Sequence, residues 1–290
     1  MISISINHES CTKCSMCVEV CPAKVFRQES RDEFPDMVFP KSCIVCGHCV
    51  AICPHDAVIH AGFPAEKITS ANHELLPSEE QLFELIKSRR SIREFKDKPI
   101  EKEVIEKIID AARFAPNAYN SQSTHYLVVQ DKEILDGIKK LSYEYLSKIV
   151  NMLHNPIQRT ILKITFGRQI ETAIKKMDEF RRFLNALEKG DDLIFRDAPC
   201  AIFFHADAGV AMSDINANLA LQNATLILEA MKLGGFYTGY VVAMGDKNKR
   251  LLEYLKIPKG HKIYGGLAIG YPKYKYNKRV ERNPAKITWV

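Results

Sequence analysis

The sequence predicts an α+β chain of two domains, a small cysteine-rich module followed by a larger domain with a mixed sheet flanked by helices. Eight of its nine cysteines lie between residues 11 and 53. Further along the chain, short apolar stretches of strand length alternate with longer stretches of helical period. A length of 290 residues with 46% hydrophobic content is enough to bury a second core. We therefore expect the module at residues 1–62, a linker at 63–77 and the larger domain at 78–290.

The cysteines form two copies of the pattern C-x2-C-x2-C-x3-C-P, offset by 32 residues throughout. This is the ligand pattern of a pair of 4Fe-4S clusters, in which the fourth cysteine of each copy binds the cluster of the other copy. One predicted ligand set is Cys11, Cys14, Cys17 and Cys53, and the other is Cys43, Cys46, Cys49 and Cys21.

Two other uses of these cysteines are less consistent with the pattern. Zinc sites separate paired C-x2-C knuckles by a longer spacer. A disulfide framework suits a short secreted chain, but residues 1–10 contain neither a basic nor an apolar segment of a signal peptide. The first 60 residues resemble a bacterial-type two-cluster ferredoxin, and the match covers essentially the whole module.

The larger domain opens with two predicted helices. Ser78 and Gln81 form a capping box before the first helix. The second helix covers about 101–114 and ends at Pro116. A buried strand at 126–130 and a long, charged helical insert at about 132–197 follow. The remaining predicted elements are a strand at 199–205, a buried helix at 216–233, a strand at 236–243, a helix around 247–255 and a strand at 263–269.

Positive charge is concentrated in the larger domain. Residues 1–60 carry five basic and seven acidic side chains, a net charge of −2. Because the whole chain has a net charge of +6, residues 61–290 carry a net charge of +8. The C-terminal tail from Lys273 to Lys286 is especially basic. A nucleic-acid or membrane patch is one interpretation, although tyrosines interrupt the basic residues, and a phosphate-binding tail is the other. We expect the second, with no nucleic-acid or membrane partner.

A second basic cluster, Arg89-Arg90-Ser91-Ile92-Arg93-Glu94-Phe95, ends the first helix. By itself it could complement the helix C-terminus or form a solvated face. Together with residues 115–122 (APNAYNSQ), the glycine turn at 234–239, residues 270–272 (GYP) and residues 282–284 (RNP), it resembles the nitroreductase family of FMN enzymes. The resemblance covers residues 78–290. It departs at Ser123-Thr124, where the family often has Pro-Trp, and it is loose over 132–197.

The resemblance implies a nitroreductase-like fold, bound FMN and an intertwined homodimer in which residues 114–120 serve the partner's flavin. It implies phosphate and ribityl contacts from Arg89, Ser91 and the tail, where Arg282 and Arg279 are the alternatives. The flavin N5 is then the reactive atom, and no side chain is expected as catalytic acid or base. The full set of implied FMN contacts is Arg89, Arg90, Ser91, Arg93, Asn117, Asn120, Gln122, Thr238, Gly239 and Arg282.

Together the two domains suggest an iron–sulfur flavoprotein oxidoreductase in the cytoplasm. Electrons from a low-potential donor, such as a ferredoxin, would pass through the clusters to FMN and on to a nitro compound, quinone or activated alkene; NAD(P)H is the alternative donor. The competing hypothesis is a non-catalytic electron carrier or flavin-based redox sensor. His125, His205 and Cys200 lie in strand patterns, where we expect them to be packed in the core.

Overall fold

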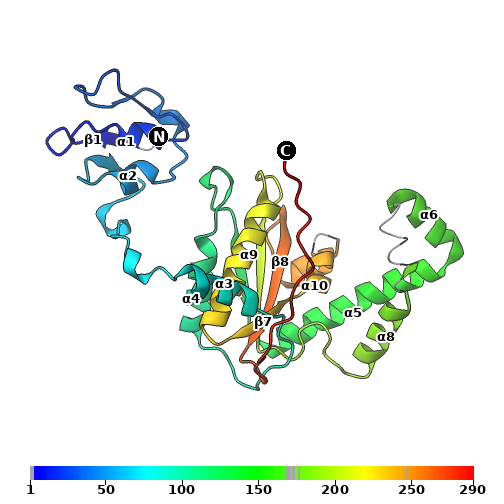
Figure 1. Ribbon diagram of the computed structural model, residues 1–290. Helices are drawn as coiled ribbons and strands as arrows, with labels where there is room; N and C mark the ends of the chain where they lie inside the picture. The colour runs from blue at the N-terminus through cyan, green and yellow to red at the C-terminus, as the bar shows by residue number, and fades with distance from the viewer. Residues whose placement is uncertain (1–2, 167–170, 172–173, 176, 246) are drawn as a thin grey trace. The chain divides into compact units, whose positions relative to one another are not determined.

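The computed structural model describes residues 3–166, 171, 174–175, 177–245 and 247–290, and it divides into two compact units (Figure 1). The cysteine-rich unit consists of Met1–Pro77 together with Asn117–Ser121. The larger unit consists of Ser78–Pro116 and Gln122–Val290. The predicted linker at 63–77 therefore groups with the cysteine-rich unit, and so does a short segment that lies between two elements of the larger unit in the chain.

The cysteine-rich unit has little regular structure. Its strands form two antiparallel pairs, β1 (Ile4–Ile6) with β4 (Val58–His60) and β2 (Phe26–Arg27) with β3 (Asp36–Met37). Three of the eight buried residues of its core are cysteines, so apolar packing alone is small. Its helical turns are α1 (Met16–Glu19), η1 (Pro40–Ser42), α2 (His48–Ile52), η2 (Ala65–Lys67) and η3 (His73–Leu75).

The larger unit is built on a four-stranded sheet in the order β5-β6-β8-β7, with antiparallel neighbours throughout. The only parallel pairing described is the isolated bridge between Ser91 and Gly235. The central strands β6 and β8 are buried along most of their length. The strands are β5 (His125–Val129), β6 (Cys200–Asp207), β7 (Gly234–Tyr237) and β8 (His261–Gly270).

Two apolar cores cover the two faces of this sheet. Because side chains alternate along a strand, Ile202 of β6 joins one core and its neighbour Phe203 joins the other. The first core packs the sheet against α4 (Lys102–Arg113) and α9 (Ser213–Ala230). The second packs it against α5 (Lys132–His154), α10 (Gly239–Met244) and α11 (Lys249–Tyr254).

The predicted capping box is confirmed at the start of α3 (Glu79–Ser88), where Ser78 and Gln81 exchange hydrogen bonds. No residue of α3 is buried, and its apolar side chains Leu82, Phe83 and Ile86 are exposed. The predicted strands at 126–130, 199–205 and 263–269 and the helix at 247–255 agree with β5, β6, β8 and α11 to within three residues.

Two predicted elements differ from the structure. The strand expected at 236–243 is wrong beyond Tyr237, because Thr238 turns the chain and residues 239–244 form α10. The buried helix expected at 216–233 is α9, which begins three residues earlier and ends at Ala230. Lys232 adopts a left-handed φ of 57° there, and the Leu233 N–H donates to the Leu228 carbonyl. α9 is also only partly buried, because Ile215 and Leu219 are exposed.

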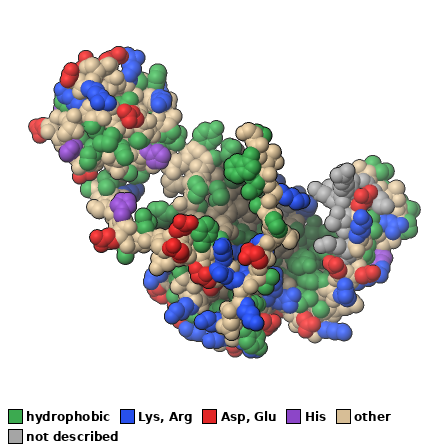
Figure 2. All heavy atoms as spheres, in the orientation of Figure 1, with side chains coloured by type: hydrophobic (Ala, Val, Ile, Leu, Met, Phe, Trp, Pro, Cys, Tyr) green, Lys and Arg blue, Asp and Glu red, His purple; other side chains and the backbone are tan. Residues whose placement is uncertain are grey.

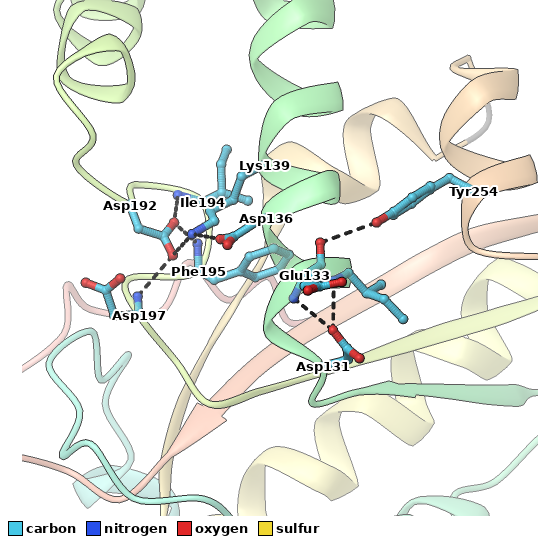
Figure 3. Close-up of polar contacts among 10 residues, drawn as sticks. Asp131, Glu133, Asp136, Lys139, Asp192, Ile194, Phe195, Asp197 and Tyr254 are labelled. Carbon is cyan, nitrogen blue, oxygen red and sulfur yellow. Dashed lines mark hydrogen bonds and ion pairs between the residues drawn. The ribbon is translucent and has the colours of Figure 1, made fainter.

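The helical insert comprises α5, α6 (Pro156–Phe166) and α8 (Met177–Glu188). Figure 3 shows how its base is held. Asp131 caps α5 by accepting the Glu133 and Ile134 N–H groups. The buried carboxylate of Asp192 accepts three N–H groups of the following turn and pairs with Lys139 of α5 at 3.5 Å. None of the helices in the described residues combines the length and apolarity needed to cross a membrane.

Candidate functional site

The cysteine-rich unit contains two cavities, each lined by four cysteines. Each set combines three cysteines of one copy of the motif with one of the other, as the spacing predicts for a two-cluster protein. The first cavity is lined by Cys11, Cys14, Cys17 and Cys53, and the second by Cys21, Cys43, Cys46 and Cys49.

These cavities suit a cluster with its own positive charge. Burial, followed by the neighbouring cysteines of the same set, raises the pKa of Cys17 and of Cys49 to about 11. Metal ligation requires thiolates, so an iron–sulfur core must supply the charge that keeps these groups deprotonated. Within the described parts of the chain, no three Cys, His, Asp or Glu side chains are placed to hold one metal ion. Each set of four cysteines lines a cavity of its own, as the ligands of a 4Fe-4S cluster would.

Backbone N–H groups donate to several of these sulfurs. In the first set, the Ala57 N–H donates to Cys53 Sγ at 3.3 Å. In the second set, the Val25 N–H donates to Cys21 Sγ at 3.3 Å and the Val45 N–H to Cys43 Sγ at 3.4 Å. His60 Nε2 also lies 3.5 Å from Cys43 Sγ. Such donors stabilise negative charge on the sulfur and thereby influence a cluster's reduction potential.

In the larger unit, the C-terminal end of α3 and the C-terminal tail line a basic cavity of about 300 Å³. Arg89 and Arg90 contribute from the segment directly after α3, and Arg282 contributes from the tail. Arg279 also lines this cavity, but its guanidinium pairs with Glu84. Arg282 has no ion pair among the described residues, so it is the tail arginine that is available to an anion. Figure 2 shows Lys and Arg side chains near α3 and the tail.

Arg90 and Arg93 have additional contacts within the protein. The Arg90 guanidinium donates to the carbonyls of Lys87 and Arg89, so it complements the end of α3. The Arg93 guanidinium lies over the Phe236 ring, 5.7 Å from its centroid. Arg90 therefore complements the C-terminus of α3, whereas Arg89 makes no such side-chain hydrogen bond among the residues that the structure describes.

A second, smaller cavity is lined by Arg89, Ser91 and the residues of β7. The bridge between Ser91 and Gly235 and the hydrogen bond from the Ile92 N–H to the Gly235 carbonyl, 3.0 Å long, fix this strand-like segment beside β7. Gly234 is required there because a Cβ would lie 2.6 Å from Ile92. The glycine turn of the sequence thus lies beside the segment that carries Ser91.

The turn between β7 and α10 contains a buried side-chain hydroxyl, that of Thr238. The Thr238 hydroxyl is buried and is without a hydrogen-bond partner among the described residues. A buried polar group without a partner is costly, so it is an expected feature of a ligand site. Gly239 next to it is exposed, and a Cβ there would meet open space. Both residues were predicted to border a flavin.

The remaining predicted contacts lie at residues 117–122. Asn117 and Asn120 belong to the cysteine-rich unit, whereas Gln122 begins the next part of the larger unit. The Asn120 side-chain amide donates to the backbone carbonyls of Val45 at 2.6 Å and of Ile44 at 3.4 Å. The backbone of this segment is strained, with φ values of 54°, 50° and 45° at Tyr119, Asn120 and Gln122.

A histidine cluster was not predicted from the sequence. His205 Nδ1 lies 3.0 Å from His261 Nδ1, and the His125 ring centroid is 5.0 Å from that of His261. His205 is buried as expected, but His125 is exposed. Only the register of β5, β6 and β8 brings the three rings together. The expected buried position of Cys200 is confirmed, and burial raises its pKa to about 12.

Comparison with known families agrees with this division of the chain. The Nitroreductase family profile matches residues 86–271, and the profile of a 4Fe-4S dicluster domain matches residues 10–58. A protein of Archaeoglobus fulgidus named "Putative NADH dehydrogenase/NAD(P)H nitroreductase" is 28% identical over 199 residues, which cover 67% of this chain and 87% of that protein. "FMN reductase [NAD(P)H]" of Bacillus subtilis is 27% identical over 202 residues, covering 68% and 69%.

Solved structures show the same fold in the larger part of the chain. A nitroreductase with bound FMN from Desulfitobacterium hafniense has a TM-score of 0.53 and 21% identity, covering 72% of this chain and 97% of that one. An FMN-dependent nitroreductase from Clostridium difficile has a TM-score of 0.52 and 21% identity, covering 73% and 100%. The cysteine-rich part is therefore an addition to a fold that is otherwise matched almost end to end.

Proposed function

The chain belongs to the nitroreductase family of oxidoreductases and carries an N-terminal 4Fe-4S domain, and from this premise we propose that it is an iron–sulfur flavoprotein. In this proposal, electrons from a low-potential one-electron donor pass through two 4Fe-4S clusters to FMN. They are then delivered to an electrophilic acceptor, such as a nitro compound, a quinone or an activated alkene. NAD(P)H is a second donor class, because names of several relatives include it.

Two features of the chain support this proposal. The same chain gathers two crossed sets of four cysteines and, in its larger unit, a basic cavity closed by Arg89 and Arg282. Cysteine sets of this kind hold clusters that carry single electrons. A cavity with two guanidinium groups suits a phosphate ester, because guanidinium binds phosphate by charge-assisted hydrogen bonds.

The chain's own residues supply binding and orientation. Arg89 and Arg282 neutralise the phosphate, and Ser91 donates a hydroxyl hydrogen bond. Gly239 leaves room for a ring system at the end of β7. FMN, when bound, accepts and delivers electrons at its N5 position, and we assign no side chain as acid or base.

We also propose that the chain forms a homodimer. Leu82, Phe83 and Ile86 expose between 43% and 51% of their surface on α3, and no residue of that helix is buried. A helix whose apolar side chains stay exposed in one protomer is stabilised when they pack against another surface. On the expected family arrangement, residues 114–120 of one protomer would contribute to the flavin site of its partner.

The FMN site is tested by removing its cationic groups. We predict that Arg89→Ala and Arg282→Ala each weaken FMN binding by about tenfold to a hundredfold, because a charged hydrogen bond contributes on the order of 1.5 to 3 kcal/mol. Arg250→Ala, which removes an arginine paired with Glu144 elsewhere in the same unit, is the matched control. Fluorescence titration of flavin-free protein measures the effect. Unchanged affinity in both site variants would contradict the phosphate assignment.

A further inference from the structure

The two copies of the cysteine motif have equivalent strained turns. With the offset of 32 residues, Lys13 in the first copy corresponds to Val45 in the second. Their φ values are 58° and 55°, in the left-handed region that non-glycine residues rarely adopt. Such a residue is strained, and the surrounding structure must compensate for the strain. The groups that hold the carbonyls of these two residues are therefore important for the shape of each cysteine turn.

In the first copy, the amide that holds the turn comes from within the module. Gln28 Nε2 donates to the Lys13 carbonyl at 3.1 Å, and the Ser15 hydroxyl donates to Gln28 Oε1 at 2.8 Å. The residue equivalent to Gln28 in the second copy is His60. Its imidazole lies against Cys43 Sγ instead, 3.5 Å away. The second copy thus lacks the internal amide of the first.

Asn120 supplies the missing amide from outside the repeat. Its Nδ2 lies 2.6 Å from the Val45 carbonyl oxygen, although 75 residues separate the two in the chain. The segment Asn117–Ser121 that carries it groups with the cysteine-rich unit, although its neighbours on both sides belong to the larger unit. Asparagine also tolerates the left-handed φ of 50° that this position requires.

This contact reaches a cluster ligand through one peptide group. Asn120 Nδ2 also donates to the Ile44 carbonyl at 3.4 Å, and that carbonyl belongs to the same peptide as the Val45 N–H. The Val45 N–H in turn donates to Cys43 Sγ. Because hydrogen bonds in series polarise one another, donation to the carbonyl strengthens the N–H as a donor to sulfur. A stronger donor favours the reduced cluster, which carries more negative charge, and raises its reduction potential.

We propose that Asn120 is a positioning residue for the second cysteine set, where it replaces the amide that Gln28 supplies to the first. The reduction potential of the cluster held by Cys21, Cys43, Cys46 and Cys49 then depends on residues 117–121, while that of the other cluster does not. This inference rests on the proposed function, in which Asn117 and Asn120 are candidate flavin contacts.

The test uses the full chain with its clusters assembled and its FMN removed. Asn120→Gly keeps the positive φ but removes the amide, and Asn120→Gln restores an amide. Gln28→Ala is the matched variant for the first set. Redox titration followed by EPR, together with the hyperfine-shifted NMR signals of the cysteine β-protons, reports each cluster separately and requires no turnover.

We expect Asn120→Gly to lower the potential of the second cluster alone and Asn120→Gln to return it towards the original value. Gln28→Ala should change the first cluster alone. If Asn120→Gly destabilises its turn, iron loss confined to the second set and reversed by Asn120→Gln supports the same role. No change in either cluster, or equal changes in both, would overturn the proposal. Because FMN is absent from this experiment, a failure of the flavin assignment would leave these results intact.

Discussion

The folded structure of each of the two units is stabilised in a different way. In the larger unit, apolar side chains such as Ile202, Phe203 and Leu267 fill a core on each face of the sheet without any ligand. In the cysteine-rich unit, Cys17, Cys21 and Cys49 are themselves part of a small core. A small unit with few apolar contacts depends on what its thiolates bind. We therefore expect that loss of iron and loss of apolar packing damage different parts of the same molecule.

Iron removal should have the largest effect. We predict that anaerobic chelation abolishes the regular structure of the cysteine-rich unit while the larger unit keeps its sheet. The physical reason is that the energy of cluster binding is also the folding energy of a ligand-dependent unit. Amide hydrogen exchange with peptide resolution measures the loss separately in β4 and in β6. Protection that disappears from both strands together, or from neither, would contradict the distinction between the units.

The next prediction concerns the pH dependence of the larger unit. Burial, then His261 and His125, lower the pKa of His205 to about 4, below the ordinary value of about 6.5. Between these values the unfolded chain binds more protons, so stability falls as the pH falls from about 6.5 to 4. The free energy of unfolding falls by roughly 3 kcal/mol at most over this pH range.

Urea unfolding of the larger unit at several pH values measures the slope of its free energy of unfolding against pH. His205→Gln should remove most of this slope, whereas His73→Gln, at an exposed position of the cysteine-rich unit, should leave the slope unchanged. An equal slope in the original protein and in His205→Gln would show that other groups control the acid sensitivity.

The smallest of these effects is expected at the base of the helical insert. Asp192→Ala removes the acceptor for three N–H groups and the partner of Lys139, and should cost about 1 to 3 kcal/mol. Asp178→Ala, which removes an exposed ion pair with Arg181, should cost less than about 1 kcal/mol. Chemical denaturation of the larger unit compares the two. Similar losses in both variants would mean that the Asp192 turn does not anchor the insert.

Features encoded locally in the sequence were predicted well. The two crossed cysteine sets expected from the spacing each line one cavity, and their binding of two 4Fe-4S clusters stays a prediction. The capping box at Ser78 and the periodic apolar residues of α4 also depend only on near neighbours.

Features created by distant contacts were not predicted. The strand that follows Gly234 ends at Tyr237 because Thr238 packs under β8, which the local apolar run does not reveal. The histidine cluster depends on strand register. Asn120 was predicted as a flavin contact from its motif, but its contact with Val45 bridges 75 residues and has no signal in the sequence.

The central claim is that the cysteine-rich unit delivers electrons to the flavin. The most direct test is stopped-flow reduction of FMN by the same reduced one-electron donor in the full chain and in a chain that begins at Pro77. We expect rapid flavin reduction in the full chain and loss of most of that rate in the shortened one, while direct reduction by a nicotinamide, where it occurs, is retained. Equal rates of flavin reduction in both forms would contradict the claim and favour a separate electron carrier or a redox sensor.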